Sequence, residues 1–224
     1  MTDMRQIAVG DIHGCVKTFR ALVRDELKLT TKDHLILLGD IIDRGPDSKG
    51  VIDEIIALKE RGIRVQVLQG NHEEMMINAS QSHERNDYWL RNGGKETLDS
   101  FGVKHVSEIP INYLDFIRYT ELYIETAETI FVHAGLNFNK SDPFSDYDSM
   151  KWIRKMEVDP SKIGNRTIVH GHVPAPLPLL LKSRKFNINL DAGCVYKEIP
   201  TTVLGKPDRK RALEIAKGMK KLNE

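Results

Sequence analysis

Two carboxylates and a guanidinium stand close together in the chain, because Asp40, Asp43 and Arg44 follow the apolar run 35–38. A short apolar run of this kind is typical of a buried strand, so the three side chains belong to the loop at its carboxyl end. In open α/β sheets, ligands bind at that end of the strands. The two carboxylates would repel each other unless a cation lay beside them, and both Arg44 and a metal ion are candidates. Taken alone, the segment could also be a solvated turn.

Other apolar segments also end in residues that can bind metal ions. The runs at 6–9, 65–68, 129–132 and 167–169 indicate strands. The residues that follow them are, in chain order, Asp11 and His13, then Asn71 and His72, then His133, then His170 and His172. A Gly-Asp pair is often a turn, and a lone histidine is often a hydrogen-bonded core residue. These simpler explanations would have to hold at every strand end.

The mixture of imidazole and carboxylate groups indicates the kind of metal. It suits Mn, Fe, Zn or Ni better than Ca or Mg, which prefer shells made of oxygen alone. The candidate ligands are too many for one tetrahedral site. Two metal ions that share one carboxylate could bind all of these candidate ligands.

The elements that must position these residues are those of an α/β protein. Three strand–loop–helix units in series predict a parallel sheet, with helices at 16–27 and at 48–61, the second capped by Ser48 and ended by Gly62. Helices are expected next at 74–90, 95–101 and 111–120, and then a hairpin of 122–124 with 129–132. A polar loop (137–148), a helix (149–156) and a second set of strands follow, the strands at 167–169, 177–181, 186–190 and 201–204. The pattern predicts two facing mixed β-sheets with helices outside.

Composition limits the class of protein. The chain has 224 residues, 40% hydrophobic and 29% charged, with a net charge of +1. We therefore expect a soluble, cytoplasmic monomer of one domain (1–224) that binds neither nucleic acid nor membranes. Cys15 and Cys194 are expected to be free thiols, and Cys15 has no catalytic role. The basic tail 206–224 is expected to be a solvated helix or, alternatively, a helix that docks a partner.

Several motifs carry a family resemblance. Residues 10–14 (Gly-Asp-Ile-His-Gly), 39–45 (Gly-Asp-Ile-Ile-Asp-Arg-Gly) and 70–73 (Gly-Asn-His-Glu) resemble the signature of the phosphoprotein phosphatase branch of the calcineurin-like metallophosphoesterases. Residues 133–135 and 171–172 are similar to its later metal motifs. The segment 189–196 resembles the one that follows them in bacterial and phage-type members. The resemblance implies an αββα sandwich.

The resemblance also implies a dimetal site. Asp11 and His13 would bind the first metal and Asp40 would bridge both. The second metal would be completed by Asn71, His133 and His172. The expected ions are two divalent metals, Mn²⁺ first and Fe, Zn or Ni as alternatives, which would share a hydroxide that attacks phosphorus in line.

Four further residues receive catalytic roles from the resemblance. His72 would donate a proton to the leaving oxygen, and Asp43 would hold its imidazole. Arg44 would bind phosphate oxygens with its planar fork, and Arg154 resembles a second phosphate-binding arginine, although it could instead be a helix-surface residue. His170 is expected to be packed or to support a ligand rather than to bind a metal.

The substrate implied is a phosphorylated protein or a small phosphoester. A serine/threonine phosphatase is favoured, because Asp43 and Glu73 depart from the symmetrical dinucleoside tetraphosphate hydrolases, which commonly lack that aspartate and have Gly-Asn-His-Asp. A serine alkoxide leaves poorly and needs a proton donor, whereas a nucleotide phosphate leaves more easily. The tetraphosphate hydrolase is the alternative, and a metal-free binding or scaffold protein is a remote one.

Overall fold

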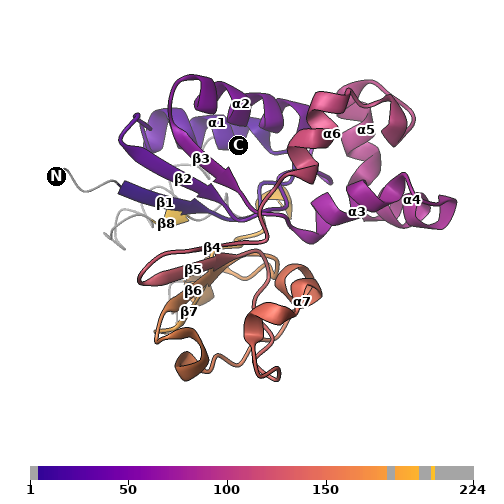
Figure 1. Ribbon diagram of the computed structural model, residues 1–224. Coiled ribbons are helices and arrows are strands. Elements are labelled where there is room, and N and C mark those ends of the chain that lie inside the picture. Colours follow the sequence, from indigo (N-terminus) through magenta and orange to yellow (C-terminus); the bar gives the residue numbers. More distant parts are fainter. Residues whose placement is uncertain (1–4, 181–184, 197–202, 205–224) are drawn as a thin grey trace.

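The computed structural model describes residues 5–180, 185–196 and 203–204, and it is a sandwich of two β-sheets flanked by helices (Figure 1). The first sheet contains β1 (Arg5–Val9), β2 (Asp33–Leu37), β3 (Arg64–Val67) and β8 (Val203–Leu204), in the order β3-β2-β1-β8. The second contains β4 (Tyr123–Glu125), β5 (Thr129–Val132), β6 (Thr167–His170) and β7 (Asn187–Asn189), in chain order. The expected mixed α/β architecture is therefore confirmed.

Parallel pairing brings the functional loops together. β1, β2 and β3 are parallel neighbours, and so are β5, β6 and β7. β4 and β5 form the expected antiparallel hairpin. Because the parallel strands of each sheet end at one edge, the loops after β1, β2, β3, β5 and β6 meet there.

Side-chain alternation along the strands builds separate cores on the two faces of each sheet. In β2, Leu35 and Leu37 point toward the helices, whereas Ile36 and the following Leu38 point into the layer between the sheets. In β5, Phe131 points into that same layer, while Ile130 and Val132 face the outer core of the second sheet. The apolar runs of the sequence are thus strands buried on both faces.

Helices cover the outer faces, and a helical segment closes one end (Figure 1). α1 (Val16–Ala21), continued by the π-helical turn η1 (Leu22–Glu26), and α2 (Ser48–Glu60) cover the first sheet. α7 (Tyr147–Trp152) covers the second. The end segment contains α3 (Asn71–Ala79), α4 (His83–Trp89), η2 (Leu90–Gly94), α5 (Lys95–Phe101) and α6 (Ile111–Arg118). Short helices are η3 (Val106–Glu108), η4 (Pro143–Ser145), η5 (Pro160–Ile163), α8 (Leu177–Leu180) and η6 (Cys194–Tyr196).

Two of the expected helices differ from those in the structure. The helix expected over 74–90 is two helices, because the Ser82 hydroxyl accepts the Arg85 amide and starts α4. The helix expected over 149–156 already ends at Trp152.

One cap, one strand and the sheet of another strand were also wrongly predicted. The cap of α2 is Asp47, whose carboxylate accepts the Gly50 amide at 2.7 Å, and not Ser48. The strand expected over 177–181 is α8 within the described part. Pro178 cannot donate a ladder hydrogen bond, but it fits the first turn of a helix. β8 pairs with β1 in the first sheet and not with the second set of strands.

Three further expectations from the sequence concern membrane-spanning helices, the basic tail and the two cysteines. Among the described residues, no helix is long and apolar enough to cross a bilayer. The basic tail 206–224 lies outside the described residues. Cys15 and Cys194 carry thiols and are not joined in a disulfide, as expected.

Candidate metal centre and active site

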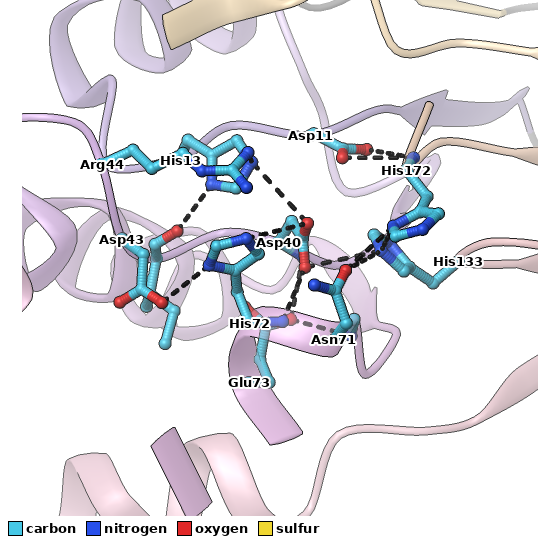
Figure 2. Close-up of polar contacts among 12 residues, drawn as sticks. Asp11, His13, Asp40, Asp43, Arg44, Asn71, His72, Glu73, His133 and His172 are labelled. Atoms are coloured by element: carbon cyan, nitrogen blue, oxygen red, sulfur yellow. Dashed lines mark hydrogen bonds and ion pairs between the residues drawn. The ribbon is translucent and has the colours of Figure 1, made fainter. Parts of the chain in front are cut away.

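Asp40 lies at the centre of the converging loops (Figure 2). The preceding Gly39 adopts a φ of 97°, and a Cβ atom there would come within 2.7 Å of the Gly70 amide nitrogen. The absence of a side chain thus lets the loops after β2 and β3 touch. Asp40 itself has a φ of 49°, in the left-handed region that few residues other than glycine adopt. Its Oδ1 atom accepts the amide of His72 at 3.0 Å.

One group of candidate ligands, here called the His133 cluster, consists of Asp40, Asn71, His133 and His172. The Nε2 atom of His133 lies 3.1 Å from Asn71 Oδ1, 3.3 Å from His172 Nδ1 and 3.5 Å from Asp40 Oδ1. His133 Nδ1 donates to the Leu38 carbonyl at 2.8 Å, so Nε2 carries a lone pair.

The His133 cluster therefore has the donor set of a metal site. A lone pair and two oxygen acceptors face one another in a buried space, and a cation between them would relieve their repulsion. The Nε2 atom of His172 is buried and has no hydrogen-bond partner among the described residues. Burial, together with His133 and less strongly the charge of Arg154, lowers the pKa of His172 to about 3, which keeps its imidazole neutral and able to bind a metal.

The second group, here called the His13 cluster, consists of His13, Asp40 and His72, whose ligand atoms lie within 4.8 Å of one another. His13 Nδ1 donates to the Ile42 carbonyl at 2.9 Å, and its Nε2 lies 3.6 Å from Asp40 Oδ2. Burial lowers the pKa of His13 to about 3. The guanidinium of Arg44 donates to the same Nε2 atom at 2.9 Å. Because Nε2 has one lone pair, a metal ion there would displace Arg44.

Asp11 lies beside His172 of the His133 cluster but belongs to neither three-residue group of the described residues. Its two carboxylate oxygens accept the His172 amide at 3.1 and 3.2 Å. Burial, and then the charges of Asp191 and Asp40, raise the pKa of Asp11 well above its ordinary value. Negative charges gathered in this way would be stabilised by bound cations.

His72 and Asp43 form a buried pair. His72 Nδ1 donates to Asp43 Oδ2 at 2.8 Å, and the opposite nitrogen, Nε2, lies 4.0 Å from Asp40 Oδ2. Burial alone would lower the pKa of His72, but the charges of Asp40 and Asp43 outweigh it and raise the pKa. Burial raises the pKa of Asp43. Nε2 has no hydrogen-bond partner among the residues that the structure describes, so in the cationic form of His72 the proton on Nε2 would be available for transfer.

Residues that sequence reasoning missed surround these groups. Glu73 is buried, and its carboxylate accepts the amides of Asp40, Ile41 and Gly70 at 2.8 to 2.9 Å. Burial, and then the charge of Asp40, raise the pKa of Glu73 to about 7. Its place in the motif at 70–73 was a signal that it matters, but its contacts to the loop after β2 could not be read from the sequence.

Two other missed residues, Trp89 and Thr97, contact the carboxylate of Asp43. They belong to α4 and α5, in the helical part of the sequence that carried no motif. Ser48 also lies here, and its hydroxyl accepts the Asp43 amide at 3.0 Å. Its role is at the site and not at the helix cap.

Arg154 and His170 lie at the edge of the site. Arg154 is exposed and follows the end of α7, so it is not on a helix surface. It lines a cavity of about 590 Å³ together with His170. His170 is buried, and its ring contacts the Gly171 carbonyl at 3.0 Å and Asn187 at 2.7 Å. The expectation that His170 is packed agrees with these contacts.

A comparison with known proteins decides the family. The model for calcineurin-like phosphoesterases matches residues 4–200. The chain belongs to the calcineurin-like phosphoesterase family. The converging His and Asp groups of this phosphoesterase are those that could hold metal ions.

Two curated relatives of the phosphoesterase carry different names. It is 41% identical over 69 residues to a symmetrical bis(5'-nucleosyl)-tetraphosphatase of Buchnera aphidicola subsp. Acyrthosiphon pisum, which covers 31% of this chain and 24% of that protein. It is 40% identical over 86 residues to serine/threonine-protein phosphatase 1 of Salmonella typhimurium, which covers 38% of this chain and 37% of that protein. The phosphoesterase thus matches less than half the length of either relative.

The fold also agrees with that of a solved structure. A cold-active protein-tyrosine phosphatase of a psychrophilic Shewanella species matches with a TM-score of 0.62 at 14% identity, covering 92% of this chain and 76% of that one. This likeness concerns the fold of the phosphoesterase.

Proposed function

We propose that this phosphoesterase is a metal-dependent phosphomonoesterase, and specifically a protein serine/threonine phosphatase. The observation that supports it most is the buried pair of His72 and Asp43, whose free Nε2 atom faces Asp40. A serine or threonine alkoxide is a poor leaving group, and a proton from Nε2 would neutralise it as the phosphorus–oxygen bond breaks. A phosphoanhydride needs this proton less.

The residues that would hold the metal ions are Asp11 and the members of the two clusters other than His72. Asp11 and His13 would bind one ion, Asp40 would bridge, and the other ligands would be Asn71, His133 and His172. Mn²⁺ is the proposed ion, since this donor set accepts Mn, Fe, Zn or Ni. Bound there, the metals would supply Lewis-acid activation of a water nucleophile and neutralise phosphate charge.

Arg44 and Arg154 are proposed to bind the phosphate. The guanidinium of Arg44 reaches His13 Nε2, so it lies next to the place where the substrate's phosphate would sit. A planar guanidinium can pair with two phosphate oxygens at once. Arg154, on the side of His172, would offer a second charge.

A second candidate is symmetrical hydrolysis of dinucleoside tetraphosphates. The name of the Buchnera relative favours this candidate. Its aligned segment is 41% identical to this chain, and that of the Salmonella phosphatase is 40% identical. In that reaction the leaving group is a nucleotide, and the proton from His72 would contribute less.

The deciding experiment compares three substrates in the presence of Mn²⁺. A phosphoserine peptide, a phosphotyrosine peptide and diadenosine tetraphosphate are given to the same enzyme, and kcat/KM is measured for each. We expect the phosphoserine peptide to be the best substrate. A clear preference for diadenosine tetraphosphate would replace this proposal by the second candidate, and no hydrolysis of any phosphoester after metal addition would refute both.

A further inference from the structure

The carboxylate of Asp43 is held by residues of a distant helical segment. This segment, residues 83–101, is here called the clamp segment, and it comprises α4, η2 and α5 at the end of the sandwich (Figure 1). The indole Nε1 of Trp89 donates to Asp43 Oδ1 at 3.1 Å and to Oδ2 at 2.9 Å. The hydroxyl of Thr97 donates to Oδ1 at 2.7 Å. Asp43, Trp89 and Thr97 are all fully buried.

These contacts fix the carboxylate in one orientation. Oδ1 accepts from Thr97 and Trp89, while Oδ2 accepts from Trp89 and from His72. Any rotation of the carboxylate would leave a buried donor without its acceptor, which typically costs about 1–3 kcal/mol. The direction in which His72 presents its ring is therefore set from the clamp segment.

The hydroxyl of Thr97 has no freedom to turn away. The Asp43 amide donates to both Ser48 Oγ and Thr97 Oγ1, each at 3.0 Å. The two hydroxyl oxygens lie 2.9 Å apart. Since Thr97 uses its one proton on Asp43, Ser48 must donate to Thr97. The network thus fixes the direction in which each of the two hydroxyl groups donates its proton.

The indole of Trp89 is also confined. A Cβ atom at Gly94 would come within 2.4 Å of the indole ring, so the glycine leaves space for Trp89 to approach Asp43. The same stretch contacts the neighbouring residue of the loop, because the Gly93 carbonyl accepts the Arg44 amide at 3.0 Å. Asp43 and Arg44 both have positive φ values, of 69° and 65°, so this loop conformation needs such support.

We propose that Trp89 and Thr97 are positioning residues that hold Asp43, and through it His72, in the orientation that delivers a proton to the leaving oxygen. This inference rests on the proposed role of His72 as the acid. The inference adds that proton delivery depends on the clamp segment as well as on the loops that carry the candidate metal ligands. Substrates with poor leaving groups require the clamp segment, and substrates with good leaving groups do not.

The test uses the full chain with excess Mn²⁺ and two substrates, a phosphoserine peptide as alkyl ester and p-nitrophenyl phosphate as aryl ester. Thr97→Val removes the hydroxyl on α5 at nearly constant volume, whereas Thr97→Ser retains it. Trp89→Phe removes the indole N–H on α4. Ser100→Ala is the matched control, because Ser100 lies on α5 and its hydroxyl donates to the Thr97 carbonyl and not to Asp43. The midpoint temperature of thermal unfolding is measured for each variant.

We expect Thr97→Val and Trp89→Phe to lower kcat for the alkyl ester by about tenfold or more, a part of what an acid contributes. The aryl ester should change little, KM should be unchanged, and Thr97→Ser and Ser100→Ala should resemble the parent. Equal slowing of both esters, or failure of Thr97→Ser to restore the alkyl rate, would overturn the inference. Trp89→Phe gives an independent result if Thr97→Val does not fold.

His72→Asn, measured beside them, separates the two proposals. If it selectively slows the alkyl ester and the clamp variants do not, the inference is wrong and the proposed acid stands. If His72→Asn slows both esters equally, the role of His72 is wrong and the inference falls with it.

Discussion

The Nδ1 atom of His72 lies 2.8 Å from Oδ2 of Asp43, and both side chains are fully buried. Asparagine at position 72 could still donate to Asp43, but it could not release a proton. We therefore expect His72→Asn to lower kcat for alkyl phosphates by about 10²–10⁴-fold. Aryl phosphates, whose leaving groups are stable anions, should be slowed far less. Steady-state kinetics on both esters test this, and unchanged metal content shows that the site is intact.

The role proposed for Asp40 differs from that proposed for Asp43, since Asp40 belongs to both clusters. Asp40→Asn removes the negative charge that would bridge two cations. We expect loss of tight binding of both metals and of nearly all activity. Metal content after dialysis, measured by elemental analysis, is the check. Asp87→Asn, at a partly exposed position whose carboxylate pairs with His83, is the control and should retain both metals. Full metal occupancy of Asp40→Asn would show that Asp40 is not the bridge.

Arg44 is a candidate phosphate ligand because its guanidinium reaches His13 Nε2. Arg44→Ala should mainly raise KM, by about tenfold, the loss of one charge-assisted contact of about 1.5 kcal/mol. Arg44→Lys keeps the charge but loses the planar fork, so it should recover a part of the affinity. Initial-rate kinetics over a range of phosphoester concentrations measure both. Unchanged KM and kcat in Arg44→Ala would remove this residue from the site.

The metal-capable residues could be found from the sequence because each follows an apolar strand. Asp40, Asn71, His133 and His172 meet in the structure since parallel strands end at one edge, and this consequence follows from the order of elements alone. The same reasoning failed for 177–181, where apolar residues indicated a strand but Pro178 favours a helical turn.

The residues that hold the proposed catalytic groups could not be found in this way. Trp89 and Thr97 contact Asp43 across more than 40 residues of chain. A tryptophan and a threonine on helices are ordinary core residues in sequence, and no local pattern indicates a partner so distant. Such contacts depend on how the end helices pack against the loop after β2, which is a tertiary property.

Glu73 holds the loops after β2 and β3 together, because its carboxylate accepts three backbone amides. Glu73→Gln replaces one acceptor oxygen by a donor NH₂ group, which would face an amide donor. We expect a loss of about 1–3 kcal/mol in the free energy of unfolding, as for a buried donor left unpaired. Urea unfolding of the metal-free protein measures it. Glu84→Gln, at an exposed position on α4, is the control and should leave the free energy of unfolding nearly unchanged.

His34, on β2, is buried, and neither ring nitrogen has a hydrogen-bond partner in the part of the chain that the structure describes. His34→Leu should therefore increase the free energy of unfolding by about 1 kcal/mol at pH 8. Burial, and then the charge of Arg64, lower the pKa of His34 from 6.5, and the side chain of Gln66 and the charge of Glu121 oppose this shift only in part. At this residue the unfolded chain thus binds more protons than the folded one below about pH 6.5, so the contribution of His34 to stability falls as the pH falls through that value.

The stability difference between His34→Leu and the parent should consequently widen between pH 8 and pH 5. The other buried histidines are present in both proteins and cancel in this comparison. Urea unfolding at the two pH values measures the difference, and His83→Leu, at a position whose side chain is 91% exposed, is the matched control. A constant difference across this pH range would mean that His34 has the same proton affinity folded and unfolded, contrary to its buried, unpartnered position.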